Sequence, residues 1–245
     1  MLDKSPPLFF GMIFRAPSPA SSPANATPLF HIGRVSLHLL DDWSIIYSMS
    51  KTDTRAVLID EGLKALLSHG YEGAGIGPIL KSAGVPKGSF YHFFTSKEEF
   101  ASAVLASYCN NNQKVRAQLL LEDKTRSPLR RLRDYFEYYE KEYGSGDPTC
   151  GCLLGNLSQS IAAHSEVLQR ELHRSFTAWQ GDFRAVLREA RDAGELPEYL
   201  DPDETAAFLI DAYEGALVRM KAEGSIKPLQ RFSTMTLDVL LTQKS

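Results

Sequence analysis

The chain has 245 residues, of which 43% are hydrophobic, and a formal net charge of −3. This length suits one or two domains with a sizeable core, and the small negative charge excludes a protein that is basic throughout, so any nucleic-acid surface has to be local. Three cysteines do not make the even framework of small secreted domains, and Cys150 and Cys152 have no histidine pair at ligand spacing. We therefore expect no metal site, no cofactor and a reduced, cytoplasmic protein.

Residues 1–50 are rich in Pro, Ser and Ala and predict a disordered leader. A signal peptide is one alternative. It is disfavoured because the negative charge of Asp3 cancels the positive charge of Lys4, and because the apolar run that follows is short. Another alternative is a start codon placed too early, since Met49 opens the stretch MSKTDTRAV, which is typical of a natural beginning. No apolar run approaches the length that spans a membrane.

After residue 50 the chain has the periodicity of α-helices almost throughout. A first helix carries apolar residues on one face and is expected to end at Gly70. Two short helices are then expected over residues 76–83 and 86–93, with Gly84 and Val85 as the turn between them. Two short helices joined by a tight turn with glycine are typical of a helix-turn-helix.

The rest of the chain continues the helical pattern. Ser96, followed three residues later by Glu99, is a capping box and predicts the start of a fourth helix. Apolar residues spaced by three and four, with turn-forming residues between them, predict further helices over residues 127–143, 153–163, 165–193, 202–223 and 228–242. No strand alternation of any length is present, so the fold class is all-α.

The second short helix has the composition of a surface that binds phosphate. Between residues 80 and 97 there is no acid, and the basic side chains are Lys81, Lys87 and Lys97. In a helix-turn-helix the second helix enters the major groove of DNA and the first crosses the backbone. Gly88 lets the backbone approach DNA closely, and Ser89 can donate to a phosphate or a base edge.

The stretch from residue 54 to 108 resembles the DNA-binding domain of the TetR family of transcriptional repressors. The matching elements, in order, are Thr54-Arg55, Gly70-Tyr71, Ala83-Gly84-Val85, Lys87-Gly88-Ser89-Phe90-Tyr91, Phe94 and Ser96-Lys97-Glu98. The resemblance implies a homodimeric repressor of operator DNA, not an enzyme. It implies a three-helix DNA-binding domain, expected at residues 51–99, and a C-terminal helical domain for ligand binding and dimerisation, expected at residues 100–245.

The family's DNA contacts carry over to positions that match its motif. The resemblance places Lys87, Gly88 and Ser89 at the groove of the DNA. It places Tyr91 and His92 on the DNA backbone, and Lys97 on a phosphate. It makes Phe90 and Phe94 packing residues, and packing is also an open alternative for His92. One departure is Gly75, where the family usually has a serine or threonine that touches phosphate, so that contact is in doubt.

The C-terminal half resembles a subgroup of the family that responds to electrophiles or small unsaturated compounds, including the N-ethylmaleimide-reductase repressor and acrylate-responsive repressors. The stretch CGCLLGNLSQS carries this resemblance, in which the subgroup's cysteine matches Cys152 and its lysine matches Lys221. Independently, Cys152 opens a predicted helix, and a helix N-terminus lowers the pKa of a thiol and makes it reactive. The alternative is a small buried residue, the commoner fate of a free cysteine.

Other candidates for the effector site are polar or aromatic. Asn156 and Gln159 are placed to orient a polar ligand, and the aromatic candidates are Tyr135, Tyr138, Tyr139 and Trp179, each equally explained as helix core. The two DNA-binding domains bind half-sites that lie about one DNA turn, roughly 34–36 Å, apart. To release DNA, an effector has to favour a spacing of the two domains that does not match this distance. We expect the last two helices, residues 202–223 and 228–242, to form the dimer interface.

Other functions remain open within the same class. One is a regulator with a non-covalent ligand, and another is an activator or global regulator without a small ligand. An α-helical enzyme is disfavoured, because the sequence has no phosphate-binding loop, metal-ligand cluster or arrangement typical of a catalytic triad.

Overall fold

The computed structural model describes residues 51–242, with side chains from residue 54 onward. The expected leader, residues 1–50, lies outside the described part of the chain. Every regular element between residues 51 and 242 is a helix, which confirms the all-α prediction. None of these helices is both long and apolar enough to cross a lipid bilayer.

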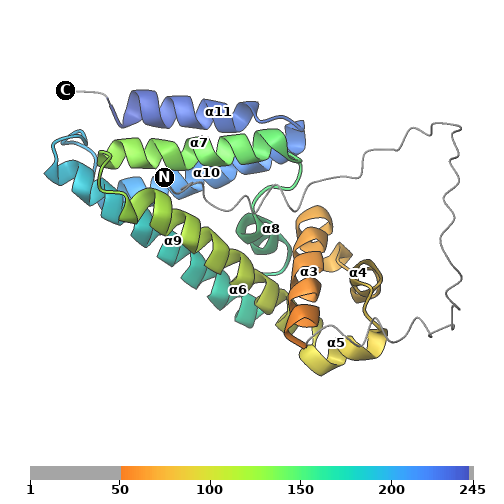
Figure 1. Cartoon of the computed structure of the whole chain (residues 1–245). Helices are drawn as coiled ribbons and strands as arrows, with labels where there is room; N and C mark the ends of the chain where they lie inside the picture. The colour runs from red at the N-terminus through yellow and green to blue at the C-terminus, as the bar shows by residue number, and fades with distance from the viewer. Residues whose placement is uncertain (1–50, 243–245) are drawn as a thin grey trace, which may run out of the picture.

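The N-terminal unit consists of three helices and the start of a fourth (Figure 1). They are α3 (Lys51–Gly73), α4 (Ile76–Ala83), α5 (Lys87–Phe93) and α6 (Lys97–Arg116). Their shared core includes Leu63, Ile79, Phe90, Phe94 and Phe100. The expected helix end at Gly70 is a kink instead, with a φ of +66°, after which α3 resumes for one turn.

The C-terminal unit is a bundle in which α7, α9, α10 and α11 pack against one another, and α6 leads into it from the N-terminal unit (Figure 1). Its elements are η1 (Ala117–Glu122), α7 (Pro128–Ser145), α8 (Leu153–Ser160), α9 (Glu166–Asp192), α10 (Pro202–Glu223), α11 (Lys227–Ser233) and η2 (Thr234–Leu240), with η1 and η2 π-helical. Where both ends of a helix were predicted, they agree with these to within three residues, except that the one helix predicted over residues 228–242 is α11 followed by η2. The expected boundary between residues 99 and 100 falls in the first turn of α6, which contacts both α3 and α9.

Polar side chains fix the starts of several helices. Ser96 Oγ accepts a hydrogen bond from the N–H of Glu99 at 3.0 Å, as the predicted capping box requires. The returning contact is shifted by one residue, because the Glu99 carboxylate accepts from the N–H of Thr95 at 2.7 Å. At the start of α10, Asp201 accepts from the N–H of Glu204 at 3.0 Å. Each such bond satisfies a donor that the helix leaves unpaired and stabilises the fold by about 1 kcal/mol.

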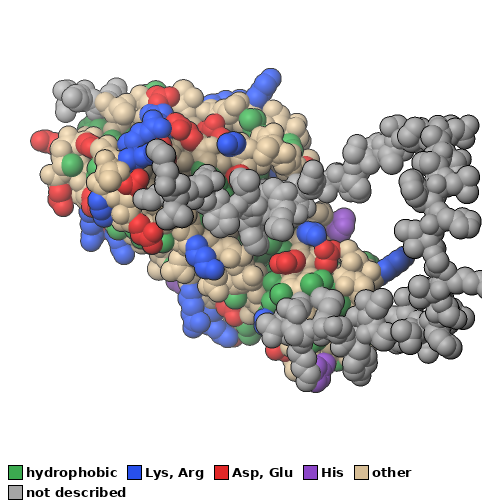
Figure 2. Space-filling model, viewed as in Figure 1, with side chains coloured by type: hydrophobic (Ala, Val, Ile, Leu, Met, Phe, Trp, Pro, Cys, Tyr) green, Lys and Arg blue, Asp and Glu red, His purple; other side chains and the backbone are tan. Residues whose placement is uncertain are grey.

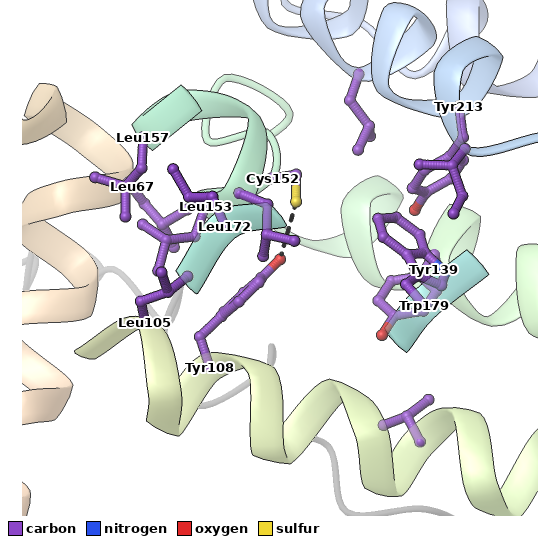
Figure 3. Packing of buried hydrophobic residues seen from close by; sticks show 14 of the residues in the cluster. Leu67, Leu105, Tyr108, Tyr139, Cys152, Leu153, Leu157, Leu172, Trp179 and Tyr213 are labelled. Carbon is purple, nitrogen blue, oxygen red and sulfur yellow. Dashed lines mark hydrogen bonds between the residues drawn. The ribbon is translucent and has the colours of Figure 1, made fainter. Parts of the chain in front are cut away.

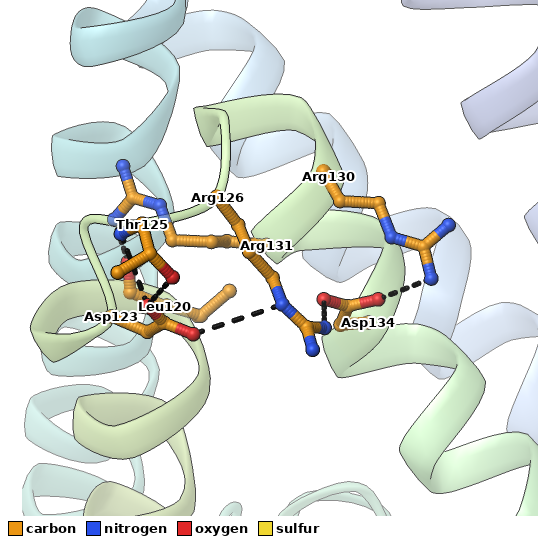
Figure 4. A network of polar contacts seen from close by, with 7 residues as sticks. All are labelled: Leu120, Asp123, Thr125, Arg126, Arg130, Arg131 and Asp134. Carbon is orange, nitrogen blue, oxygen red and sulfur yellow. Dashed lines mark hydrogen bonds and ion pairs between the residues drawn. The ribbon is translucent and has the colours of Figure 1, made fainter.

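A buried arginine holds the segment between α6 and α7. The sequence pattern assigns no element to residues 117–122, where the structure has η1. From α7, the Arg131 guanidinium donates to the carbonyl of Leu120 in this segment and to the carboxylate of Glu189 in α9. Beside it, Asp134 pairs with two further arginines (Figure 4). Hydrophobic periodicity carries no sign of such a contact, which explains why η1 is absent from the prediction.

Basic side chains are not confined to the N-terminal unit. Figure 2 shows Lys and Arg side chains along α6 and α9 as well, and the exposed arginines of α9 include Arg170, Arg174, Arg184 and Arg188. Acidic groups are mixed with these, as where Arg188 pairs with Asp203 at 2.8 Å. The short helix α5 differs in that its sequence, KGSFYHF, has no acid at all.

Candidate nucleic-acid interface and sensor cavities

A tight turn and an aromatic anchor hold α5 in place. Gly84 has a φ of +65° and a ψ of 26°, a left-handed conformation that costs glycine little. The N–H of Val85 donates back into the last turn of α4 at 3.0 Å. Phe90 and Phe94 are buried, and their ring centroids lie 5.3 and 5.0 Å from that of Phe100. The predicted helix-turn-helix and its two packing aromatics are confirmed.

The face of α5 that points away from this anchor is open to solvent. Lys87, Gly88, Tyr91 and His92 are exposed, and Tyr91 keeps 60% of its surface accessible. A Cβ built on Gly88 would meet no atom within 4 Å, so packing within the chain does not explain a glycine there. A lysine with flat side-chain donors and no neighbouring acid is a surface able to contact phosphate.

Ser89 and Lys97 are half-buried. The Lys97 ammonium donates to the carbonyl of Glu72 at 3.3 Å and lies 4.7 Å from the centre of the Tyr71 ring. These contacts fix the ammonium beside the C-terminal end of α3 and leave donors over for another acceptor. His92 is exposed and is therefore not part of the core, although its ring makes an edge-to-face contact with that of Phe93 at 5.4 Å between centroids.

Gly75 precedes α4 and provides no side-chain cap, as expected. Its carbonyl accepts from the N–H of Ile79 at 3.3 Å, which starts the helix through the backbone. A Cβ at this position would lie 3.2 Å from Cδ of Pro78, closer than an ordinary contact. The proline in the first turn of α4 therefore favours glycine before it, and Gly75 offers DNA no hydroxyl.

Cys152 lies between two cavities. It is the N-cap of α8 and only 6% exposed. The first cavity, of about 220 Å³, brings together the three residues expected to sense an effector, Cys152, Asn156 and Lys221, and also Gln159. Asn156 links its neighbours, because its Nδ2 donates to the carbonyl of Cys150 at 2.9 Å and its Oδ1 accepts from Lys221 at 3.3 Å.

The second cavity, of about 180 Å³, has six aromatic side chains among the fifteen residues that line it, and we call it the aromatic cavity. Figure 3 shows four of them, Tyr108, Tyr139, Trp179 and Tyr213. The aromatic candidates Tyr135, Tyr139 and Trp179 belong to its lining, whereas Tyr138 does not. Sequence reasoning missed Tyr108, whose hydroxyl lies 3.5 Å from Cys152 Sγ. An aromatic residue on a helical stripe has the same pattern whether it lines a cavity or fills a core, so the sequence held no signal for this residue.

The one arginine deep in the aromatic cavity is already paired. Arg116 Nε donates to Asp182 Oδ2 at 2.6 Å, with both side chains largely enclosed. One turn before Arg116 on α6, Asn112 Oδ1 accepts from the hydroxyl of Tyr139 in α7 at 2.5 Å. Because the guanidinium charge of Arg116 is offset by a carboxylate and the second lining arginine, Arg174, is exposed to solvent, the enclosed part of the cavity is suited to a small, uncharged molecule.

The expected lowering of the Cys152 pKa is wrong. Burial raises the pKa of this thiol well above its ordinary value, and the carboxyl of Glu214 raises it further. The N-terminus of α8 acts in the expected direction, because the N–H of Gly155 bonds to the sulfur and lowers the pKa, but burial outweighs it. Lys221 does not compensate, since its ammonium is directed to Asn156. In the resting protein Cys152 is a protonated thiol at neutral pH.

The other two cysteines have no comparable setting. Burial raises the pKa of Cys150 to about 12, and it also raises the pKa of Cys109, which bonds to Ser175 Oγ at 3.3 Å. All three cysteines are free thiols. Within residues 51–242, no cluster of three or more His, Cys, Asp or Glu side chains is arranged to hold a metal ion.

Two family models match the chain, one for each unit of the fold. Residues 58–104 match the model described as "Bacterial regulatory proteins, tetR family". Residues 128–236 match the model described as "Tetracyclin repressor-like, C-terminal domain". The two matched ranges cover the helix-turn-helix and most of the helices around the two cavities.

Individual proteins match along nearly their whole length. The transcriptional repressor DhaR of Mycobacterium sp. (strain GP1) is 36% identical over 193 residues, which are 79% of this chain and 95% of DhaR. The crystal structure of regulatory protein TetR from Rhodobacter sphaeroides has a TM-score of 0.73 at 35% identity and covers 77% of this chain and 98% of its own. Reduced NemR of E. coli has a TM-score of 0.68 at 27% identity, over 79% of this chain and 100% of its own. These relatives are named regulators, not enzymes.

Proposed function

The chain belongs to the TetR family of transcriptional regulators, and from this premise we propose that it is a repressor that leaves its operator when a small-molecule effector binds. In this proposal residues 51–99 bind DNA, and residues 100–245 bind the effector and form the homodimer. The two copies of α5 enter major grooves about one DNA turn apart. The open, acid-free face of α5 supports this role.

The proposed DNA contacts follow the family motif residue by residue. They comprise Lys87, Gly88 and Ser89 at the groove, Tyr91 and His92 on the backbone, and Lys97 on a phosphate. The exposure of Tyr91 and His92 supports a backbone contact, and Lys97 has donors left over beside the end of α3.

The observation that carries the proposal is direct contact between α8 and α3. Asn156 Nδ2 in α8 lies 3.4 Å from the carbonyl of Leu67 in α3, and Gly70 of α3 lines the same cavity as Cys152. In Figure 3 Leu67 lies beside Leu157 of α8. Because α3 supports the helix-turn-helix, an occupant of this cavity changes contacts of the DNA-binding unit itself. A ligand that prefers the altered position lowers the affinity for DNA.

We propose Cys152 as the residue that reacts with the effector, an electrophile or an unsaturated acid. Its place between both cavities supports this, since a molecule in either one reaches the sulfur. A second candidate is a non-covalent effector, favoured by the aromatic cavity of about 180 Å³, which suits a small apolar molecule.

Operator release by N-ethylmaleimide tests the covalent proposal, with an operator selected from random duplexes. We expect the wild-type protein to leave DNA at about one equivalent of reagent, and the Cys152→Ser variant to stay bound. Cys109→Ser is the control, because Cys109 is a second free thiol that lines the aromatic cavity and is less buried than Cys152; it should respond like the wild type. Equal release of Cys152→Ser contradicts covalent sensing and leaves the non-covalent candidate.

A further inference from the structure

Glu214 is an enclosed acid in contact with the sensing thiol. It lies on α10 and lines the cavity of about 220 Å³ together with Cys152, and its carboxyl lies near enough to the thiol to raise the pKa of Cys152. The Glu214 Oε1 is buried and has no hydrogen-bond partner among the described residues. Gly155 of α8 makes this approach possible, since a methyl group there would collide with Glu214 Oε2.

The titratable groups around the pair of Cys152 and Glu214 come from four places in the fold. Cys152 precedes α8, Tyr108 belongs to α6, Tyr143 to α7, and Lys221 lies on α10 itself. The Lys221 ammonium is held by a side-chain amide of α8. Burial raises the pKa of Glu214 to about 7 and keeps both tyrosines neutral by raising their pKa. Glu214 is thus the group here whose pKa lies near neutral pH, and Cys152 beside it is the protonated group that can give it a proton.

A thiol in contact with a carboxylate carries one negative charge wherever the proton lies. Moving the proton from Cys152 to Glu214 gives the reactive thiolate without adding charge to a poorly solvated site. Losing that proton to solvent would place two anions side by side instead. We propose that the Glu214 carboxylate is the proton acceptor for Cys152 when the thiol adds to a conjugated carbon–carbon double bond. This rests on the proposed function, which makes Cys152 the sensing residue.

The step is balanced within the site and the effector. The S–H proton of Cys152 passes to Glu214 as Sγ bonds to the β-carbon, and the electrons of the double bond move to the conjugated carbonyl. The resulting enolate then takes the proton from Glu214 at its α-carbon. The net change is the addition of S–H across the double bond, with Glu214 ionised again at the end.

The test is the rate of Cys152 alkylation by N-ethylmaleimide from about pH 5 to about pH 9. Intact-mass spectrometry follows the reaction in the full chain, with Cys109 and Cys150 changed to Ser so that one thiol remains. The uncharged reagent brings no second charge to the Glu214 carboxyl. The chain is compared with its Glu214→Gln and Glu214→Asp variants, with circular dichroism to check folding.

We expect the rate with Glu214 present to rise as this acid ionises, with its half-rise near pH 7, and then to level off. The sign follows from the role, because only the ionised carboxylate can accept the proton. Glu214→Gln should react about 10²-fold more slowly, a usual effect of losing a general base, and should gain rate steadily with pH. Glu214→Asp should keep a titrating step at an intermediate rate.

Provided that Cys152 of the parent protein is alkylated, three outcomes overturn the inference. One is a Glu214→Gln rate equal to that of the parent, and another is a faster one, which would mean that Glu214 only suppresses the thiolate by its charge. The third, which needs no variant, is a parent rate that climbs through pH 9 without levelling off.

Operator binding, measured on the same alkylated samples, separates the inference from the proposed function. Alkylation that depends on Glu214 but leaves DNA bound contradicts the proposed function alone. If alkylation releases the operator but its rate is the same with and without Glu214, the inference alone is contradicted. A parent protein that is not alkylated at Cys152 at any pH contradicts both.

Discussion

Lys87 projects from the first turn of a helix that contains no acid. If its ammonium contacts a phosphate, the Lys87→Ala variant releases one counterion fewer when it binds DNA. The slope of log K against log salt concentration should then become shallower by about 1, and the affinity for DNA should fall several-fold. Fluorescence anisotropy with the operator at several salt concentrations measures both. Lys141→Ala is the matched control, an exposed lysine on α7. A slope that drops equally in both variants, or in neither, contradicts the contact.

At the scale of residues, the sequence succeeds where a contact is local and fails where it is not. Phe90 and Phe94 could be assigned to packing because the motif fixes their spacing within one short helix. The electrostatics of Cys152 could not be predicted, since the neighbour that dominates after burial is Glu214, far along the chain on α10. The helix N-terminus was visible from the sequence, but the depth at which the fold buries it was not.

At the scale of elements, α5 shows how a poor helix sequence is stabilised by its surroundings. It has seven residues, including a glycine, and helices of that length are not stable alone in water. Its stability comes from Phe90, which is fully buried, and from the anchor on Phe100. Element boundaries were predictable wherever the cap is local, as at Ser96 and Asp201. The π-helix η1 was not, because it depends on a buried arginine from another helix.

Replacing the glycine of α5 should change the stability of the fold and its affinity for DNA in different directions. In Gly88→Ala the new methyl meets no atom of the chain, so the free energy of unfolding should stay the same or rise by up to about 1 kcal/mol. Operator affinity should fall, because the methyl occupies the space where DNA approaches the backbone. Urea unfolding at fixed protein concentration and operator binding measure the two effects.

Gly181→Ala in α9 is the control for this pair of effects. It also gains helix propensity, since its nearest contact would be an arginine end at 3.8 Å, but it should bind the operator like the wild type. An undiminished affinity in Gly88→Ala would show that the glycine is not needed for close approach.

At the scale of the whole molecule, α8 connects the two ends of the fold, because it contacts α3 of the N-terminal unit and α9 of the bundle. The helix-turn-helix lies at one end, and α10 and α11 lie in the bundle at the other (Figure 1). Large apolar side chains are exposed on α10 and η2, namely Phe208, Val218, Met235 and Val239. We propose that these side chains, which lie on the last helices, belong to the dimer interface expected from the family.

The dimer prediction is tested by putting a charge on that face. Phe208 is 50% exposed, so Phe208→Asp should leave each chain folded while burying a charge in the two-fold contact, which converts the protein to monomers. Light scattering after size exclusion gives the mass, and operator affinity should fall by about 10²-fold or more, because two half-sites are then bound by unlinked copies. Val167→Asp on α9, where the valine is 40% exposed, should remain dimeric and bind DNA. A dimeric Phe208→Asp protein would move the interface away from α10, and with it the axis about which the two copies of α5 are spaced on DNA.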